Sequence, residues 1–237
     1  MLFRSGQSQI VFIHGFLGSP NDWNLYQKWF NDQGYSTLAL DLNNCELDKI
    51  PEGVQPGAHI VGYSMGGRFS LHLSKAFPNF FSTFTLISTN PGLVSKEEIE
   101  KRKVWEKTWL EKMESLSLFA FICEWYSQPL FRQFTPPSER FDQDIKVVAK
   151  TFRKFSIANL PSLWDHLQQI APSTLMIFGS EDKKYMELEK YIKTRKPINE
   201  TLTTKIVRGS HSIHLESPYQ ILNEIQSFLR NYLCQPL

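Results

Sequence analysis

The sequence contains few cysteines and no long hydrophobic run. It has no apolar stretch of about eighteen residues, and no basic-then-apolar leader that ends in small residues. The three cysteines are odd in number and widely separated, which argues against a disulfide framework or a zinc cluster. We therefore expect a soluble, cytoplasmic protein with reduced thiols and no membrane partner. The thiols belong to Cys45, Cys123 and Cys234.

Neither sign of charge is in excess. Lys plus Arg is 26 and Asp plus Glu is 24 in a chain of 237 residues, so no nucleic-acid partner is expected. A G-x-G-x-x-G segment after a strand and a metal-ligand cluster with usable spacing are also missing, and we expect no cofactor and no metal. The oligomeric state is open, and a monomer is possible.

Apolar runs alternate with helical patterns along most of the chain, which predicts an α/β fold with a doubly wound, mainly parallel sheet. The sheet should be small, because only nine residues precede the first apolar run at Ile10. The expected strands are 10–14, 36–41, 58–62, 83–88, 174–179 and 203–207, and the expected helices are 20–33, 65–77, 183–194 and 217–232.

The pattern changes between Asn90 and Pro172, where strand-like runs give way to helical periodicity with many aromatic residues. We interpret this region as a helical cap inserted into the core. The predicted domains are therefore a core of residues 1–90 and 172–237 and a cap of residues 91–171. A cap that closes over a site excludes water and shapes the pocket.

A nucleophile elbow is predicted at Gly62-Tyr63-Ser64-Met65-Gly66. This segment follows the apolar run His59-Ile60-Val61 and opens a stretch that can continue as a helix. In a strand–turn–helix of the form G-x-S-x-G, the glycines permit a tight turn that exposes the serine hydroxyl above the sheet. Function is therefore expected at the carboxyl ends of the strands, with Ser64 as the nucleophile or base.

A serine hydroxyl needs a histidine and an orienting carboxylate, and in this architecture they follow the serine in the order acid, then histidine. Asp182 follows the strand that ends near Gly179, and His211 follows the last strand. We assign Asp182 and His211 to these roles. Glu181 is the alternative acid and His214 the alternative base, although bracing of the loop by hydrogen bonds also accounts for His214.

An anion hole is predicted from two backbone amides. His14-Gly15-Phe16-Leu17-Gly18 follows the first strand, and glycine there lets amide groups turn toward the site. The second donor is the residue after the nucleophile. We expect the amides of Phe16 and Met65 to converge near Ser64.

Segments beyond these motifs carry a more specific pattern. They are Gly66-Gly67-Arg68, Asn90-Pro91-Gly92-Leu93, Glu97-Glu98 with Arg102, Trp125-Tyr126-Ser127-Gln128-Pro129-Leu130-Phe131, Gly179 to Tyr185, and His211-Ser212-Ile213-His214. Together they resemble the 2-succinyl-6-hydroxy-2,4-cyclohexadiene-1-carboxylate synthase family. These are lyases of menaquinone (vitamin K2) biosynthesis with the α/β-hydrolase fold, and the resemblance covers nearly the whole chain.

The resemblance implies elimination of pyruvate from 2-succinyl-5-enolpyruvyl-6-hydroxy-3-cyclohexene-1-carboxylate, a small polycarboxylate. Ser64 would act as the base, or relay the proton to His211, without an acyl-enzyme. The substrate-binding residues that it implies are Tyr63, Arg68, Arg102, Trp125 and Arg153. The third carboxylate-binding group is left open between Arg153 and Lys150.

Two other functions use the same residues. A carboxylesterase, thioesterase or carbon–carbon hydrolase would share the triad, and rapid turnover of simple aryl esters would favour it. A non-enzymatic binding protein of this fold is the second alternative, and the intact set of Ser64, Asp182 and His211 argues against it.

Overall fold

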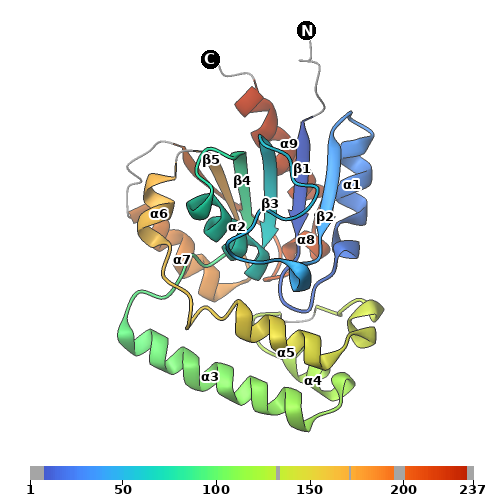
Figure 1. The fold of residues 1–237 in the computed structure, drawn as a ribbon, viewed down its shortest axis with the longest axis vertical. Helices are drawn as coiled ribbons and strands as arrows, with labels where there is room; N and C mark the ends of the chain where they lie inside the picture. Colours follow the sequence, from blue (N-terminus) through green and yellow to red (C-terminus); the bar gives the residue numbers. More distant parts are fainter. Residues whose placement is uncertain (1–7, 132–133, 171, 195–200, 234–237) are drawn as a thin grey trace.

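A six-stranded parallel sheet forms the centre of the computed structural model, which describes residues 8–131, 134–170, 172–194 and 201–233. The strand order is β2-β1-β3-β4-β5-β6 (Figure 1). The strands are β1 (Gln9–Ile13), β2 (Ser36–Leu40), β3 (Ala58–Tyr63), β4 (Phe81–Ile87), β5 (Ser173–Gly179) and β6 (Leu202–Val207). The predicted α/β fold with a small parallel sheet is confirmed, and each predicted strand overlaps one of these six.

The strands end nearly level with one another. Ile13 pairs with Gly62, Tyr63 pairs with Ile87, and Ile87 pairs in turn with Ile177. Because all the pairings are parallel, the loops that leave these strands meet at one edge of the sheet.

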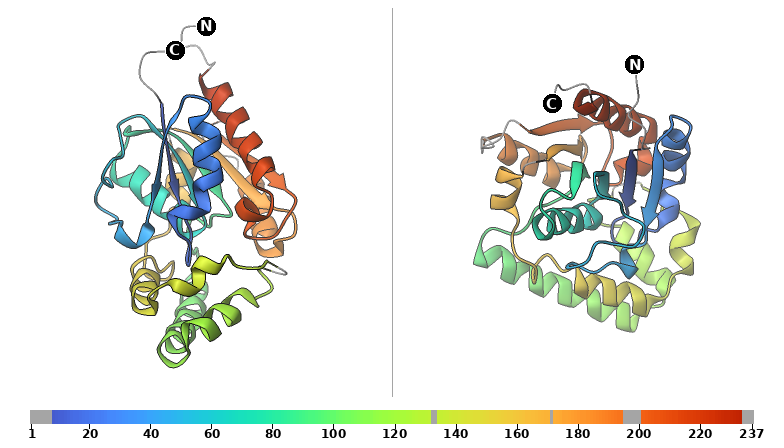
Figure 2. Two further views of the ribbon diagram at one scale, coloured as in Figure 1. Left: turned by 90° about the vertical axis from the view of Figure 1, so that its right-hand side faces the viewer. Right: turned by 45° about the horizontal axis from the view of Figure 1, so that its top comes forward.

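Helices cover both faces of the sheet, as Figure 2 shows with α9 on one side and α2 on the other. Alternate residues of β1 separate the two cores, since Ile10 and Phe12 face α1 and α9, whereas Val11 and Ile13 face the opposite side. The first face carries α1 (Asn24–Asn31), the short α8 (Ile213–Glu216) and α9 (Pro218–Leu233), and the second carries α2 (Met65–Ala76), α6 (Trp164–Gln169) and α7 (Lys183–Thr194).

The predicted helix over 20–33 is divided. Its first turn is the 3₁₀ helix η1 (Pro20–Trp23), and α1 follows it directly. The Asp22 carboxylate accepts a hydrogen bond from the Ser19 amide at 3.4 Å, and Pro20 occupies the first position, where its missing N–H costs nothing. The other three predicted helices correspond to α2, α7 and α9.

A layer of helices lies across the carboxyl ends of the strands, at the lower end of Figure 1. Its elements are α3 (Lys96–Ser115), α4 (Leu118–Tyr126), η3 (Ser138–Asp142) and α5 (Ile145–Lys154). Ser95 and Glu98 form a capping box that starts α3. Trp109 of α3 and Trp125 of α4 pack edge to face, with ring centroids 4.8 Å apart. Aromatic contacts therefore join the two helices.

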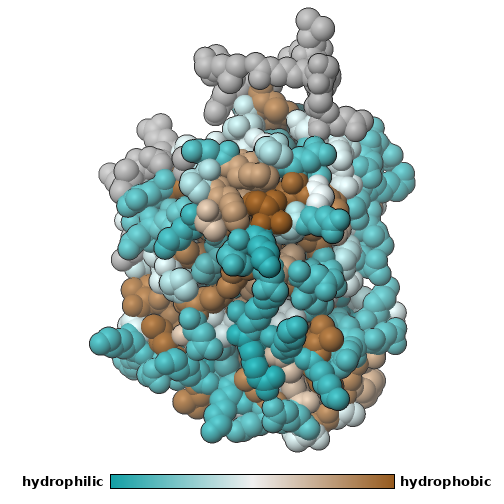
Figure 3. Space-filling model, viewed as in Figure 1, coloured by the Kyte–Doolittle hydropathy of each residue, from teal (hydrophilic) through white to brown (hydrophobic). Residues whose placement is uncertain are grey.

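The surface in the view of Figure 3 is largely hydrophilic, with apolar side chains in separate patches. Large exposed apolar residues such as Val104, Phe119 and Tyr219 lie on different elements. Among the helices that the structure describes, none combines the length and the apolar character needed to cross a membrane.

Candidate active site

The turn from β3 into α2 has the backbone geometry of a strained elbow. Ser64 has φ +50° and ψ −108°, a region that residues with a side chain rarely occupy. A Cβ on Gly62 would lie 2.6 Å from the Cα of Gly67, and one on Gly66 would collide with the carbonyl oxygen of His14. Strand and helix approach so closely that only glycine fits at these two positions.

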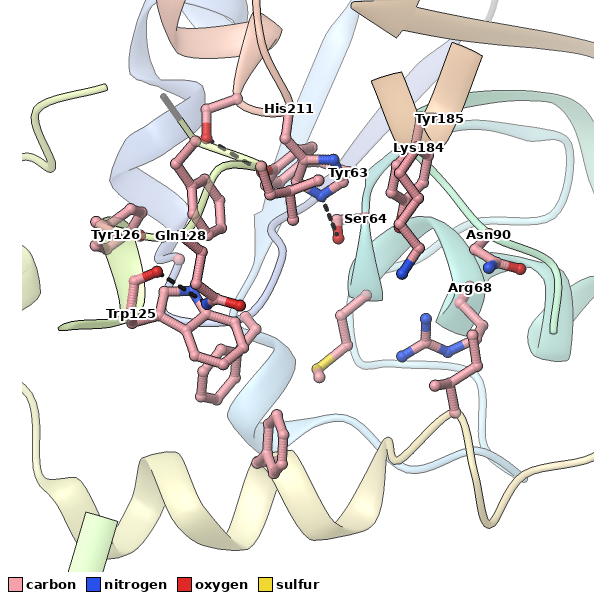
Figure 4. A pocket seen from close by; sticks show the side chains of 18 of the residues that line it. Tyr63, Ser64, Arg68, Asn90, Trp125, Tyr126, Gln128, Lys184, Tyr185 and His211 are labelled. Carbon is pink, nitrogen blue, oxygen red and sulfur yellow. Dashed lines mark hydrogen bonds between the residues drawn. The ribbon is translucent and has the colours of Figure 1, made fainter. Parts of the chain in front are cut away.

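His211 lies between Ser64 and Asp182. Its Nε2 is 3.1 Å from the Ser64 Oγ, and its Nδ1 is 2.8 Å from Oδ2 of Asp182 (Figure 4 shows the first contact). Asp182 is 2% exposed and His211 3% exposed. The second carboxylate oxygen of Asp182 accepts a bond from the Tyr185 amide at 3.2 Å, which holds the carboxylate against the start of α7. This is the geometry in which a histidine can take the serine proton.

The alternative histidine lies behind the first. His214 is 1% exposed, and its ring centroid is 3.9 Å from that of Tyr63 and 5.2 Å from that of Trp23. Burial lowers the pKa of His214 well below its usual value, so the ring is neutral. Within the part of the chain that the structure describes, neither ring nitrogen has a hydrogen-bond partner. The geometry therefore brings His211 to Ser64, and His214 packs beneath Tyr63.

The two predicted anion-hole residues line the same pocket as Ser64. Met65 is the first residue of α2, so its N–H has no acceptor within the helix and remains available. Phe16 lies on the loop after β1, next to Leu17, whose φ of +60° turns the backbone sharply. This placement is compatible with an anion hole, and the role of the two amides stays a prediction.

A pocket of about 500 Å³ opens at Ser64 between the sheet edge and the helical layer. Figure 4 shows Arg68 and Lys184 on one side of Ser64, and Trp125 and Gln128 on the other. Aromatic rings make up much of the lining, namely Phe16, Tyr63, Trp105, Trp125, Tyr126, Phe131, Phe134, Phe152 and Tyr185. The pocket therefore presents a cationic side and an aromatic side to a ligand.

Arg68 is buried beside the elbow, at 7% exposure. Its Nη2 donates to the Phe155 carbonyl at 2.9 Å, and its Nε has no partner among the described residues. Burial and the nearby charge of Arg102 lower the pKa of Arg68 to about 10. An arginine in this state has donors to spare for an anion.

Arg102 reaches the pocket from α3. Its Nε donates to Oε1 of Glu106 at 2.8 Å, and its guanidinium lies 4.0 Å from the ring centroid of Trp105. Glu106 is 6% exposed and also accepts a short hydrogen bond from Ser156. These contacts fix the direction of the guanidinium and leave part of it facing the pocket.

Arg153 lies away from the pocket, contrary to the predicted role. Its side chain is 51% exposed and pairs with Glu114 at 2.9 Å. Its neighbour Phe152 lines the pocket, and successive helical residues point about 100° apart, so Arg153 faces outward. The alternative, Lys150, is exposed and is also absent from the pocket lining.

The other two predicted substrate-binding residues, Tyr63 and Trp125, do line the pocket. The Tyr63 hydroxyl lies 3.3 Å from the Ser212 Oγ, and burial raises its pKa well above the usual value. The Trp125 ring packs against Phe16, with centroids 4.7 Å apart. Binding of substrate by either residue remains a prediction.

Three cationic residues of the pocket, Lys101, Lys184 and Arg140, were missed by sequence reasoning. Lys184 stands two positions after Asp182, and its place in the segment Gly179 to Tyr185 was the available signal. Arg140 is 3% exposed and pairs with Asp22 at 2.6 Å, across 118 positions of sequence. Nothing in the local pattern around either partner signals that pair.

Within the described residues, no group of three or more His, Cys, Asp or Glu side chains is arranged to hold a metal ion. The site consists of the triad, the pocket and their hydrogen bonds. The contact of the Ser64 hydroxyl with a buried histidine and carboxylate is suited to proton transfer or acyl transfer at the serine.

No family model matches the chain. Several known enzymes are nevertheless similar to it along most of its length. The chain is 25% identical over 247 residues to the 2-succinyl-6-hydroxy-2,4-cyclohexadiene-1-carboxylate synthase of Serratia proteamaculans, covering 94% of this chain and 93% of that protein. It is 24% identical over 259 residues to the putative synthase of Bacillus subtilis, covering 93% and 89%.

A third relative is the chloroplastic protein PHYLLO of Arabidopsis thaliana, 25% identical over 261 residues. The match includes 94% of this chain, which spans only 15% of the length of the plant protein. The resemblance to the synthase family found in the sequence is confirmed by these relatives.

Solved structures agree in fold. MenH from S. aureus superposes with a TM-score of 0.83 at 23% identity, covering 97% of this chain and 96% of the other. A carboxylesterase from Nitrososphaera superposes with a TM-score of 0.71 at 18% identity, covering 96% and 91%. The predicted α/β-hydrolase fold is confirmed.

Proposed function

We propose that this chain, a relative of the 2-succinyl-6-hydroxy-2,4-cyclohexadiene-1-carboxylate synthases with the α/β-hydrolase fold, is a carbon–oxygen lyase of menaquinone biosynthesis. It eliminates pyruvate from 2-succinyl-5-enolpyruvyl-6-hydroxy-3-cyclohexene-1-carboxylate. One observation carries the proposal, namely that a Ser64–His211–Asp182 relay opens onto a pocket with arginines on one side.

The first step is removal of an acidic proton next to a carbonyl of the substrate. Ser64 Oγ takes this proton as His211 Nε2 accepts the hydroxyl proton at 3.1 Å. Asp182, 2.8 Å from Nδ1, holds the ring in the required tautomer and stabilises the imidazolium that forms. The proton therefore ends on His211, and no acyl-enzyme is needed.

The second step moves the electron pair. Negative charge develops on the carbonyl oxygen, where the amides of Phe16 and Met65 stabilise it. The electrons then return to form a double bond between the deprotonated ring carbon and its neighbour, the existing ring double bond shifts by one position, and the bond between the ring carbon and the enolpyruvyl oxygen breaks. The leaving enolate takes a proton at carbon, from His211 or from water with His211 releasing its proton to solvent, and departs as pyruvate.

The pocket matches the substrate in charge and shape. The substrate carries a succinyl carboxylate, a ring carboxylate and an enolpyruvyl carboxylate, and arginine is suited to bind carboxylates through two parallel bonds. Arg68 and Arg102 lie on the cationic side of the pocket, and Trp125 and Phe152 offer apolar surface to the ring. A neutral ester would use the aromatic side and would offer no carboxylate to the arginines.

The direct test is incubation with the enolpyruvyl substrate while pyruvate is measured with coupled lactate dehydrogenase. Wild-type protein should release one pyruvate per substrate consumed, and Ser64→Ala should not. No release by folded wild-type protein would overturn the proposal.

A serine hydrolase is the second candidate, because the same relay is competent for acyl transfer and a carboxylesterase shares the fold. Rapid hydrolysis of simple aryl esters, unaffected by replacement of Arg68 and Arg102, would favour it. A binding protein without activity would need none of the relay, which weighs against that alternative.

We also propose a cytoplasmic location and a small-molecule substrate as the only required partner. Cys45 and Cys123 are free thiols, as is usual in a reducing compartment, and Cys234 lies outside the described residues.

A further inference from the structure

Three cationic side chains from three different helices meet at one side of the pocket. Arg68 comes from α2, Arg102 from α3 and Lys184 from α7, and all three line the cavity that contains Ser64. In Figure 4 the Lys184 side chain reaches down from α7 toward the space between Ser64 and Arg68. Like charges at such a site repel one another, and burial together with the nearby charge of Arg102 lowers the pKa of both Arg68 and Lys184.

The acidic groups nearby do not neutralise Lys184 by contact. Asp182 is engaged by His211 at 2.8 Å, and the Glu98 carboxylate accepts bonds from the amides of Val94 and Ser95, each at 3.0 Å. Lys184 itself has no hydrogen bond or ion pair to any residue that the structure describes. Its side chain is exposed at the open pocket, where a ligand can reach it.

The other cations that line the pocket already have carboxylate partners. Lys101 is 75% exposed and pairs with Glu97 at 2.6 Å, and Arg140 pairs with Asp22 at 2.6 Å. The charge of these two cations is already balanced in part by a carboxylate in contact, whereas at Lys184 an added carboxylate would meet an ammonium group with no ion pair among the described residues.

We propose that Lys184 is a substrate-binding residue that pairs with the substrate carboxylate closest to Ser64, while Arg68 and Arg102 take the other two. This proposal rests on the proposed function, because three cations are needed only for a tricarboxylate. A lysine is a compact point charge on a flexible stem, which suits a position at the open side of the pocket. Binding of the carboxylate also relieves the repulsion among the three cations.

The test separates binding from chemistry by using Ser64→Ala protein, which should hold the enolpyruvyl substrate without consuming it. Calorimetric titration gives the Kd for Ser64→Ala alone and combined with Lys184→Met or Lys184→Gln. We expect either substitution to raise Kd by about ten- to hundredfold, as for loss of one charge-assisted contact. In otherwise wild-type protein, the same substitutions should raise KM more than they lower kcat.

Lys183→Met is the matched control, since Lys183 is also exposed, precedes Lys184 in α7 and does not line the pocket. It should change Kd less than about twofold, consistent with a screened surface charge. An unchanged Kd in both Lys184 variants would overturn the proposal, as would an equal loss in the control. A fall in kcat at unchanged KM, with a lower Tm, would assign Lys184 a structural role instead.

Pyruvate release by wild-type protein separates the two proposals. If wild-type protein releases pyruvate and the Lys184 variants bind normally, only the role of Lys184 is wrong. If wild-type protein releases none, both proposals are wrong.

Discussion

The sheet with its flanking helices, the core, holds its reacting groups within hydrogen-bond distance of one another. The layer of α3, α4, η3 and α5, the cap layer, holds its pocket residues by ion pairs and ring contacts. Ser64, Asp182 and His211 follow β3, β5 and β6, so the parallel sheet brings them to one edge. Arg102 and Trp125 come from α3 and α4, where the helical face decides whether a side chain reaches the pocket. We therefore expect the core to provide the chemistry, and the core and the cap layer to share the selectivity, since Arg68 and Lys184 belong to the first and Arg102 and Trp125 to the second.

The largest effect should follow from changes in the core relay. Ser64→Ala, His211→Ala and Asp182→Asn should each lower kcat for pyruvate release by roughly two to four orders of magnitude, because the proton path is broken. Circular dichroism should show that each variant remains folded. A crippling His214→Ala with a nearly silent His211→Ala would contradict the assignment of the base.

The next largest effect should be a loss of stability when the ion pair between the core and the cap layer is broken. Arg140 of the cap layer and Asp22 of the core form a buried ion pair, 3% and 4% exposed. Asp22→Asn leaves the arginine charge buried and unpaired, so the free energy of unfolding in urea should fall by about 3–5 kcal/mol. The double variant Asp22→Leu/Arg140→Met should recover much of this loss, since it removes both charges. A single variant as stable as wild type would show that the pair does not join the regions.

The arginines test the division of labour directly. Arg68→Ala in the core and Arg102→Ala in the cap should each cost about 2–5 kcal/mol, a hundredfold or more in kcat/KM for the tricarboxylate. Hydrolysis of a small neutral ester, if any is seen, should barely change. Equal losses on both substrates would mean that these arginines hold the structure together. Negligible loss on the tricarboxylate would favour the esterase alternative.

Acid should weaken the core through its buried histidines. Burial lowers the pKa of His59 and of His72 to about 4, so both stay neutral in the folded state while the unfolded chain takes up protons below about pH 6.5. The unfolded state then binds more protons, and the free energy of unfolding falls with decreasing pH, by up to about 1.4 kcal/mol per unit for each histidine. Urea unfolding between pH 7 and 5 measures this slope. His59→Asn should lower this slope by up to about 1.4 kcal/mol per pH unit, because the unfolded chain then takes up one proton fewer. If the variant and the wild type showed the same slope, His59 would not be the source of the pH dependence.

The smallest effect should come from the outer face of the cap. Arg153→Ala removes an exposed ion pair with Glu114, and such pairs contribute about 0–1 kcal/mol. Its kcat/KM for the tricarboxylate should stay within about twofold of wild type on that estimate. A hundredfold loss would restore Arg153 to the substrate site and require the cap to move on binding.

Much of the core could be predicted because its signals are local. The run His59-Ile60-Val61 reads as a buried strand, and Gly62 and Gly66 mark a turn that no larger residue can occupy. The side chains of the cap layer that face the pocket were harder to predict. An error of one position along a helix changes the direction of the predicted side chain by about 100°. Arg153 was therefore expected in the pocket, although it is Phe152 that lines it.

The sequence by itself determined the alternation of strands and helices, the elbow at Ser64 and the order of acid and histidine, because each depends on nearby residues and on the rule that parallel strands end together. Only the tertiary structure decided which cations face the pocket and which are already paired. Arg140 pairs with Asp22 across 118 positions of sequence. Lys184 of α7 lies near Arg102 of α3, whose positive charge acts on the lysine from another helix. Charge interactions depend on distance in space and on burial, and neither quantity can be read from spacing along the chain.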